Sequence, residues 1–155
     1  WVDVGSSYVY SDLLAAFLYG QLEQMSEISI QREKIYHCYY DALKPIADKG
    51  LIELPFIPEY CESNSHMFYI LVKDIKQRNE LIAYLKNKEI HAVFHYVPLH
   101  SSPMGKKFGY QHGMFPVTEK VSDCLLRLPF YYELTESDII RICDDISQFL
   151  LSVSK

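Results

Sequence analysis

The sequence predicts an α+β fold, an α/β sandwich in which a long helix near the amino-terminal end precedes a small sheet covered by helices. Apolar residues recur at helical spacing from Asp12 to Lys44. Two short apolar runs at 67–72 and 90–97 enclose a third segment of helical spacing, a pattern typical of a compact strand-helix-strand unit. The 155 residues, 49% of them hydrophobic, are enough for one domain with its own core.

The first predicted element is a helix over 12–44. Ser11 can accept a hydrogen bond from the first free N–H groups, and Pro45 disfavours helical backbone at Lys44. Such a helix is about 50 Å long, whereas a compact domain of this length has a diameter of about 40 Å. The helix should therefore project, and its apolar stripe needs a second domain or a second subunit. The stripe consists of Leu14, Leu18, Leu22, Met25, Ile28, Ile35, Tyr39 and Leu43.

Short strands are predicted after Gly50, a residue suited to end a helix. Residues 51–54 precede two prolines and indicate an edge strand. Residues 67–72 form a continuous apolar run, which predicts a strand covered on both faces. Residues 74–88 have the pattern of an amphipathic helix, and 90–97 indicate a second strand.

The carboxyl-terminal third begins with a predicted loop over 98–116, which is rich in proline and glycine. A short helix over 118–125 and a brief strand over 126–129 follow. Thr135 to Asp138 resemble a capping box and predict the start of the last helix. Its inward face consists of Ile139, Ile142, Cys143, Ile146, Phe149 and Leu150.

Composition argues against several classes of protein. A net charge of −5 does not favour nucleic acid as a partner, and no apolar run approaches the roughly 18 residues of a membrane span. No targeting peptide is recognisable ahead of Asp12. The six glycines form neither a dinucleotide-binding nor a phosphate-loop pattern. Four cysteines without a C-x-x-C pair are typical of a reducing cytoplasm.

The run of residues from Phe94 to His100 is the most reactive polar cluster, because it lies where a predicted strand enters the long loop. His91 and His95 share one strand face and could begin a metal site, although they lack the spacing of known zinc sites. Two other interpretations remain open: a histidine satisfied by local hydrogen bonds, and a substrate-facing role for His95 or Tyr96. Spacing alone favours the satisfied histidine.

Two further segments carry weaker signals. Residues 3–8 place glycine and serines ahead of the long helix, where they could hold a phosphate, although a capping loop explains them better. Cys61, Asn64 and His66 are residue types of cysteine nucleophile catalysis. They are neighbours in a polar turn without a visible oxyanion site, so we interpret them as loop residues.

Ordered blocks along almost the whole chain carry a family resemblance. They are Val4 to Tyr8, Ser11 to Leu13, Ala15-Ala16, Gln21 to Glu23, Gln31-Arg32, Tyr39 to Leu43, Ile52 to Pro55, His66 to Ile70, Phe94 to His100, Leu125 to Pro129 and Leu134-Thr135. Together they resemble the C-terminal region of the nucleotide-sugar aminotransferases, a branch of the fold-type-I pyridoxal-phosphate enzymes. A mostly antiparallel small sheet is the fold that this resemblance implies.

The resemblance implies that 1–44 form an interdomain loop and a bridging helix, and that 45–155 form a small C-terminal domain. The cofactor domain and its lysine would precede the chain, which alone would lack turnover. The implied partners are that N-terminal domain, a homodimer partner, and nucleotide-sugar and amino-acid substrates. The implied reaction moves an amino group, with glutamate as the donor, through pyridoxal phosphate to a 4-keto-6-deoxy sugar on a nucleotide.

Three site residues follow from the resemblance. Ser7 occupies the position at which many members have the asparagine that reaches the cofactor phosphate of the neighbouring subunit. His95 and Tyr96 match a His-Tyr pair beside the nucleotide sugar, whereas no catalytic residue and no metal ligand are expected in this chain. The alternative is a free-standing ferredoxin-like module that binds a small molecule or a protein and pairs through its long helix.

Overall fold

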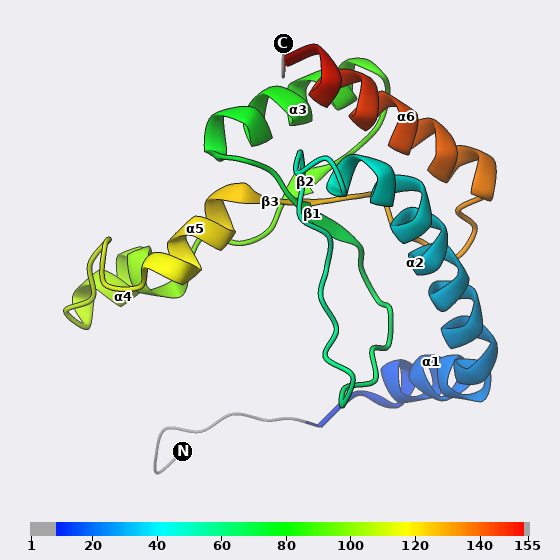
Figure 1. Ribbon diagram of the computed structural model, residues 1–155. Helices are drawn as coiled ribbons and strands as arrows, with labels where there is room; N and C mark the ends of the chain where they lie inside the picture. The colour runs from blue at the N-terminus through cyan, green and yellow to red at the C-terminus, as the bar shows by residue number, and fades with distance from the viewer. Residues whose placement is uncertain (1–8, 154–155) are drawn as a thin grey trace.

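The computed structural model describes residues 9–153. Figure 1 shows helices gathered around a small central sheet, with α1 and the α4 region extending away from it. The larger helices are α1 (Asp12–Glu23), α2 (Met25–Ala47), α3 (Ile75–Asn87), α5 (Pro116–Cys124) and α6 (Glu136–Val153). The strands are β1 (Tyr69–Leu71), β2 (Val93–Phe94) and β3 (Leu125–Arg127), and the short elements are η1 (Leu99–Ser101) and α4 (Pro103–Lys107). The predicted α+β fold is confirmed.

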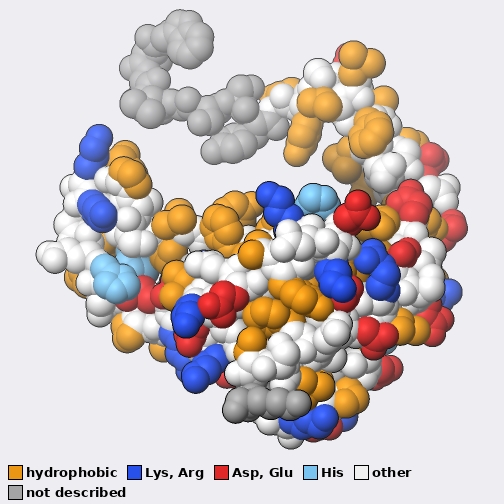
Figure 2. Space-filling model, turned by 90° about the horizontal axis from the view of Figure 1, so that it is seen from above, with side chains coloured by type: hydrophobic (Ala, Val, Ile, Leu, Met, Phe, Trp, Pro, Cys, Tyr) orange, Lys and Arg blue, Asp and Glu red, His pale blue; other side chains and the backbone are white. Residues whose placement is uncertain are grey.

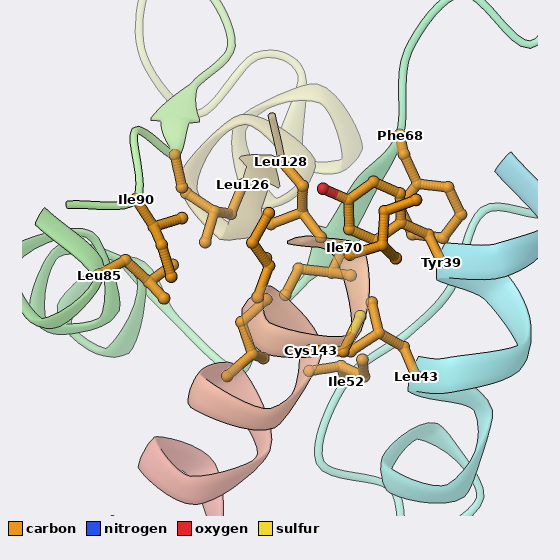
Figure 3. Close-up of a cluster of buried hydrophobic side chains, with 14 of the residues drawn as sticks. Tyr39, Leu43, Ile52, Phe68, Ile70, Leu85, Ile90, Leu126, Leu128 and Cys143 are labelled. Atoms are coloured by element: carbon orange, nitrogen blue, oxygen red, sulfur yellow. The ribbon is translucent and has the colours of Figure 1, made fainter. Parts of the chain in front are cut away.

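The sheet is antiparallel throughout and has the order β1-β3-β2. One of its faces packs on α2, α3 and α6, where Ile70 and Leu126 are fully buried. Figure 3 shows Ile70 in the middle of the cluster, near Tyr39 and Leu43 from α2 and Cys143 from α6, with Leu126 on the side of Ile90. Removal of this apolar surface from water is the main force that holds the helices on the sheet.

The continuous helix predicted over 12–44 is wrong, because the helix breaks at Gln24 between α1 and α2. The Gln24 N–H bonds the carbonyls of Gln21 and Leu22, which closes α1 with a tighter turn. Figure 1 shows α1 turned away from the axis of α2. None of the α1 residues is buried, and Phe17 is 72% exposed. The amino-terminal part of the stripe is therefore uncovered, as expected for a projecting helix.

The end of this helix also differs from the prediction. Helix α2 continues past Lys44 to Ala47 and contains Pro45. Ile46 is 4% exposed, and its burial in the core favours the additional turn despite the hydrogen bond that a proline cannot donate. Gly50, at a φ of +71°, then reverses the chain in the left-handed region that favours glycine.

The strands are shorter than predicted. Residues 51–54 contribute one bridge, between Glu53 and Leu71, and only Val93 and Phe94 of the predicted 90–97 strand pair with β3. The strand predicted over 126–129 begins directly after α5 and pairs over 125–127. The prediction that 67–72 is covered on both faces is wrong, since Phe68 and Ile70 are fully buried whereas Tyr69 and Leu71 are only half-buried.

The predicted loop over 98–116 contains two short helical elements. The Ser102 hydroxyl accepts a hydrogen bond from the Gly105 N–H at 3.0 Å, and Pro103 occupies the first turn of α4. A Cβ on Gly105 would collide with the backbone carbonyl of Leu99, so this close approach requires glycine. Within 9–153, no helix has the length and hydropathy needed to span a membrane.

Candidate functional site

The second face of the sheet is only partly covered: four of its side chains are half-buried and one is exposed. Because side chains alternate along a strand, Arg127 lies on the face opposite Leu126. The register places Arg127 of the central strand between Tyr69 of β1 and Val93 of β2. Figure 2 shows a hollow between two projecting arms, and hydrophobic, basic and histidine side chains are visible in it. We call the face that carries Tyr69, Leu71, Val93, Leu125 and Arg127 the open sheet face.

His95 and Tyr96 follow directly after β2. Alternation of side chains places His95 on the side of the open sheet face, and Tyr96 on the other side with Phe94. Their rings meet edge to face, with centroids 4.6 Å apart. His95 Nδ1 is buried without a hydrogen-bond partner among the described residues, whereas the Tyr96 side chain is 73% exposed. Buried polar atoms are normally paired, so this nitrogen is an exception within the described residues.

The position of Tyr96 is fixed from behind by the buried guanidinium of Arg78. Arg78 Nη1 donates to the Ser122 carbonyl at 2.8 Å, and the Ser122 hydroxyl donates to the Tyr96 carbonyl at 3.0 Å. The same guanidinium lies 5.5 Å from the centroid of the Phe94 ring. Two segments of the chain, 94–96 and 122, are thereby tied to α3 through one cation.

The adjacent loop is held by Glu119 of α5. Glu119 Oε1 accepts from the Gly113 N–H at 2.7 Å and lies 2.8 Å from His100 Nε2, and Oε2 lies 3.2 Å from His112 Nδ1. Burial opposes the charge on this carboxylate, but these hydrogen bonds outweigh burial and hold the pKa of Glu119 below its ordinary value. The arrangement fixes the segment around 98–116 beside Tyr96.

Sequence reasoning missed both supports. A charged residue of an amphipathic helix is expected to face solvent, yet Arg78 is 8% exposed, because its guanidinium turns toward Ser122 and Phe94. Glu119 lies in the helix predicted over 118–125, a prediction that says nothing of its contacts with His100 and His112. Ser122 lies 44 residues from Arg78 and His100 lies 19 residues from Glu119, so neither contact has a local sequence signal. An arginine within an amphipathic helix only indicates that its side chain could be buried against another segment.

The other predicted site residues are not brought together. Ser7 lies outside the described residues. His91 is exposed, and no group of three or more His, Cys, Asp or Glu within 9–153 could hold a metal ion. His66 Nδ1 lies 2.6 Å from Asn64 Oδ1, while the exposed Cys61 makes no side-chain hydrogen bond to either residue. This agrees with their interpretation as loop residues.

The chain is similar in sequence to a curated protein and in structure to solved aminotransferases. An uncharacterized protein of Methanocaldococcus jannaschii is 28% identical over 153 residues, which are 96% of this chain and 39% of the relative. The crystal structure of the aminotransferase TlmJ from Streptoalloteichus hindustanus has the same fold, with a TM-score of 0.81, 21% identity, and coverage of 98% of this chain and 40% of that one. S. venezuelae DesV gives a TM-score of 0.77 at 25% identity, covering 88% of this chain and 35% of DesV.

The chain thus spans about two fifths of the length of the first relatives it matches. It matches the family described as DegT/DnrJ/EryC1/StrS aminotransferase over residues 1–147. A match over this much of the sequence shows that the chain belongs to the DegT/DnrJ/EryC1/StrS aminotransferase family.

Proposed function

We propose that this chain is the small C-terminal domain of a pyridoxal-phosphate-dependent nucleotide-sugar aminotransferase. The family match over residues 1–147 carries the proposal. The uncovered apolar side chains of α1 support it, because a surface helix that buries none of its own residues offers them to another body. In this proposal that body is the N-terminal cofactor domain of the same polypeptide, or its partner subunit in a homodimer.

The cofactor is assigned to other residues of the longer polypeptide. Bound pyridoxal phosphate supplies an electron sink for amino-group transfer. A separate pocket beside Tyr96 is lined by Arg78, Ser101 and Glu119 among other described residues. None of its described lining residues is a lysine, so this pocket does not provide a covalent anchor for the cofactor. The Ser7 hydroxyl is proposed to reach the cofactor phosphate in the neighbouring subunit.

His95 and Tyr96 are proposed to orient the nucleotide sugar. The unpaired Nδ1 of His95 and the exposed ring of Tyr96 support this role, since sugar hydroxyls and diphosphates offer hydrogen bonds. We propose further, from the resemblance of the sequence blocks, that the enzyme is a dTDP-4-amino-4,6-dideoxygalactose transaminase. We extend the proposal accordingly to glutamate as donor, a 4-keto-6-deoxy sugar as acceptor, and the synthesis of enterobacterial common antigen or lipopolysaccharide in the cytoplasm.

A reconstitution experiment tests the domain assignment. The purified chain is incubated with pyridoxal phosphate and passed through a gel-filtration column. We expect no covalently bound cofactor to elute with the protein, because no described residue provides an anchor beside Tyr96. An absorbance band of bound cofactor at one equivalent per chain would contradict the proposal.

A kinetic experiment on the longer polypeptide tests the substrate assignment. His95→Ala should raise KM for the nucleotide sugar more than it changes the half-reaction with the amino acid. The matched control is His91→Ala, since His91 is exposed and makes no hydrogen bond to the part of the chain that the structure describes. Equal effects of His95→Ala on both half-reactions would argue against a sugar-orienting role.

A further inference from the structure

We propose that the open sheet face carries an oxyanion subsite in which Arg127 binds a carboxylate or phosphate group of a substrate. The identity of the substrates depends on the proposed function. The subsite itself is inferred from the strand register and from the unpaired polar groups of the open sheet face. Its components are the guanidinium of Arg127, the hydroxyl of Tyr69 and Nδ1 of His95.

Arg127 is a half-buried cation without a protein partner. It lies on the central strand of the sheet, and no hydrogen bond or ion pair joins it to any residue within 9–153. The other three described arginines differ. Arg78 donates to Ser122 and Asn79, and Arg141 donates to the Lys88 carbonyl. Arg32 also makes no hydrogen bond or ion pair within 9–153, but its side chain is exposed to solvent. A guanidinium that has lost part of its hydration without gaining acceptors is stabilised when a ligand supplies oxygen atoms.

The neighbours of Arg127 on this face complete the arrangement. Tyr69 lies directly opposite it on β1, and directly opposite side chains have Cβ atoms about 4.5–5.5 Å apart. The Tyr69 hydroxyl also has no hydrogen-bond partner among the described residues. Alternation past the end of β2 places His95 on the same side as Val93, and its Nδ1 is the buried atom left unpaired. Three polar groups without partners therefore share one face.

The charge of this face selects the ligand. Its remaining members, Leu71, Val93 and Leu125, are apolar. The carboxylate that the register places on the same side, Glu53, pairs opposite Leu71 and so lies one strand beyond Tyr69. A cation flanked by a phenol on an otherwise apolar floor favours an anion over a cation or a neutral sugar ring.

Geometry narrows the ligand to oxyanions. The planar fork of a guanidinium matches carboxylate and phosphate oxygens in pairs. Both reactants of the proposed function carry such groups: the amino acid has carboxylates, and the nucleotide sugar has a diphosphate. The subsite can serve either reactant, and the two sources are separated by measurement.

The test uses the longer aminotransferase polypeptide with Arg127→Met, Arg127→Lys and Tyr69→Phe. Arg141→Met is the matched control, because it removes an exposed guanidinium from α6 on the other side of the sheet. KM and kcat are determined separately for the amino acid and for the nucleotide sugar. Binding of glutarate and of inorganic pyrophosphate to the enzyme without substrates is measured by titration calorimetry, and folding is checked by thermal unfolding.

We expect Arg127→Met to raise KM for one reactant about tenfold or more, with kcat and the other KM within a factor of about three. The affinity for the matching probe should fall by a similar factor; this probe is glutarate for a carboxylate site and pyrophosphate for a diphosphate site. Arg127→Lys should recover part of the loss, since it retains the charge without the fork. Tyr69→Phe should shift the same KM in the same direction by a smaller factor.

The proposal is overturned if Arg127→Met and Arg141→Met leave both KM values and both probe affinities equally unchanged. It is also overturned if Arg127→Met acts only by lowering thermal stability while Arg127→Lys, folded like the wild type, binds both probes normally. Probe binding separates this inference from the proposed function. An enzyme that transfers no amino group to a nucleotide-linked keto sugar, yet loses probe affinity in Arg127→Met, retains the oxyanion subsite and refutes only the proposed reaction.

Discussion

Replacing Tyr39 with phenylalanine tests how α2 is attached to the sheet. The Tyr39 side chain is fully buried, and its hydroxyl donates to the Pro129 carbonyl at 2.8 Å, just after β3. Phenylalanine keeps the stacking on Phe68, whose ring centroid lies 5.1 Å away, but leaves that carbonyl without its donor. Because the carbonyl is only partly buried, we expect a loss of about 1–2 kcal/mol in unfolding free energy. This corresponds to a fall in Tm of roughly 2–8 °C for a domain of this size.

The assay is denaturant and thermal unfolding of the chain, with Tyr40→Phe as the matched control. Tyr40 is partly buried on the same helix, and its hydroxyl bonds no residue of the described chain, so its replacement should change the unfolding free energy by less than about 0.5 kcal/mol. Equal Tm values for the two variants would refute the reasoning.

The buried Tyr39 hydroxyl should also affect how stability depends on pH in alkaline solution. Burial raises the pKa of Tyr39 far above its ordinary value of 10.0. The native state therefore holds this proton where the unfolded state releases it. The stability that the protonated Tyr39 contributes is fully present below pH 10 and is lost as pH rises above this value. Tyr39→Phe should show a shallower loss of stability than the wild type in alkaline denaturation, and parallel curves would contradict the assignment.

Three other changes probe the surroundings of the site. Glu119→Gln should flatten the loss of thermal stability in acid: because its hydrogen bonds hold the pKa low, the carboxylate stabilises the fold above the ordinary value of 4.5 and loses this effect as pH falls through the lower native pKa. Phe17→Ser should leave the unfolding free energy of the chain within about 0.5 kcal/mol, yet weaken its binding to a separately purified cofactor domain in a pull-down. Ser122→Ala should raise KM for the nucleotide sugar several-fold with little change in Tm, since it removes the hydrogen bond that holds the Tyr96 carbonyl.

Local signals in the sequence predicted α3, α5 and α6 to within a few residues. The spacing from Asp74 to Lys88 and the capping group at Thr135 lie within one or two residues of the observed α3 and α6. Errors arose where packing overrides local preference. Pro45 should have ended α2, but the buried side chain of Ile46 favours the additional turn. The break at Gln24 has no glycine or proline to indicate it.

The candidate site was only partly predictable, because it depends on strand register. His95 and Tyr96 lie in a recognisable block at the end of β2, where a loop was expected to present functional groups. Arg127 is separated from Tyr69 by 58 positions, and only the antiparallel pairing of β1 with β3 places the two opposite each other. Nothing in the local sequence distinguishes Arg127 from an arginine at a solvated strand edge.

The two faces of the sheet separate stability from recognition. Leu126 and Ile70 point into the helices, where truncation removes buried apolar surface and costs roughly 2–5 kcal/mol each. Arg127 and Tyr69 alternate with them on the same strands but meet no protein partner. One three-residue strand can therefore hold the core with one side chain and a ligand with the next. The burial of Leu126 and Leu128 on either side of Arg127 fixes its backbone, so the strand determines the face from which the guanidinium projects.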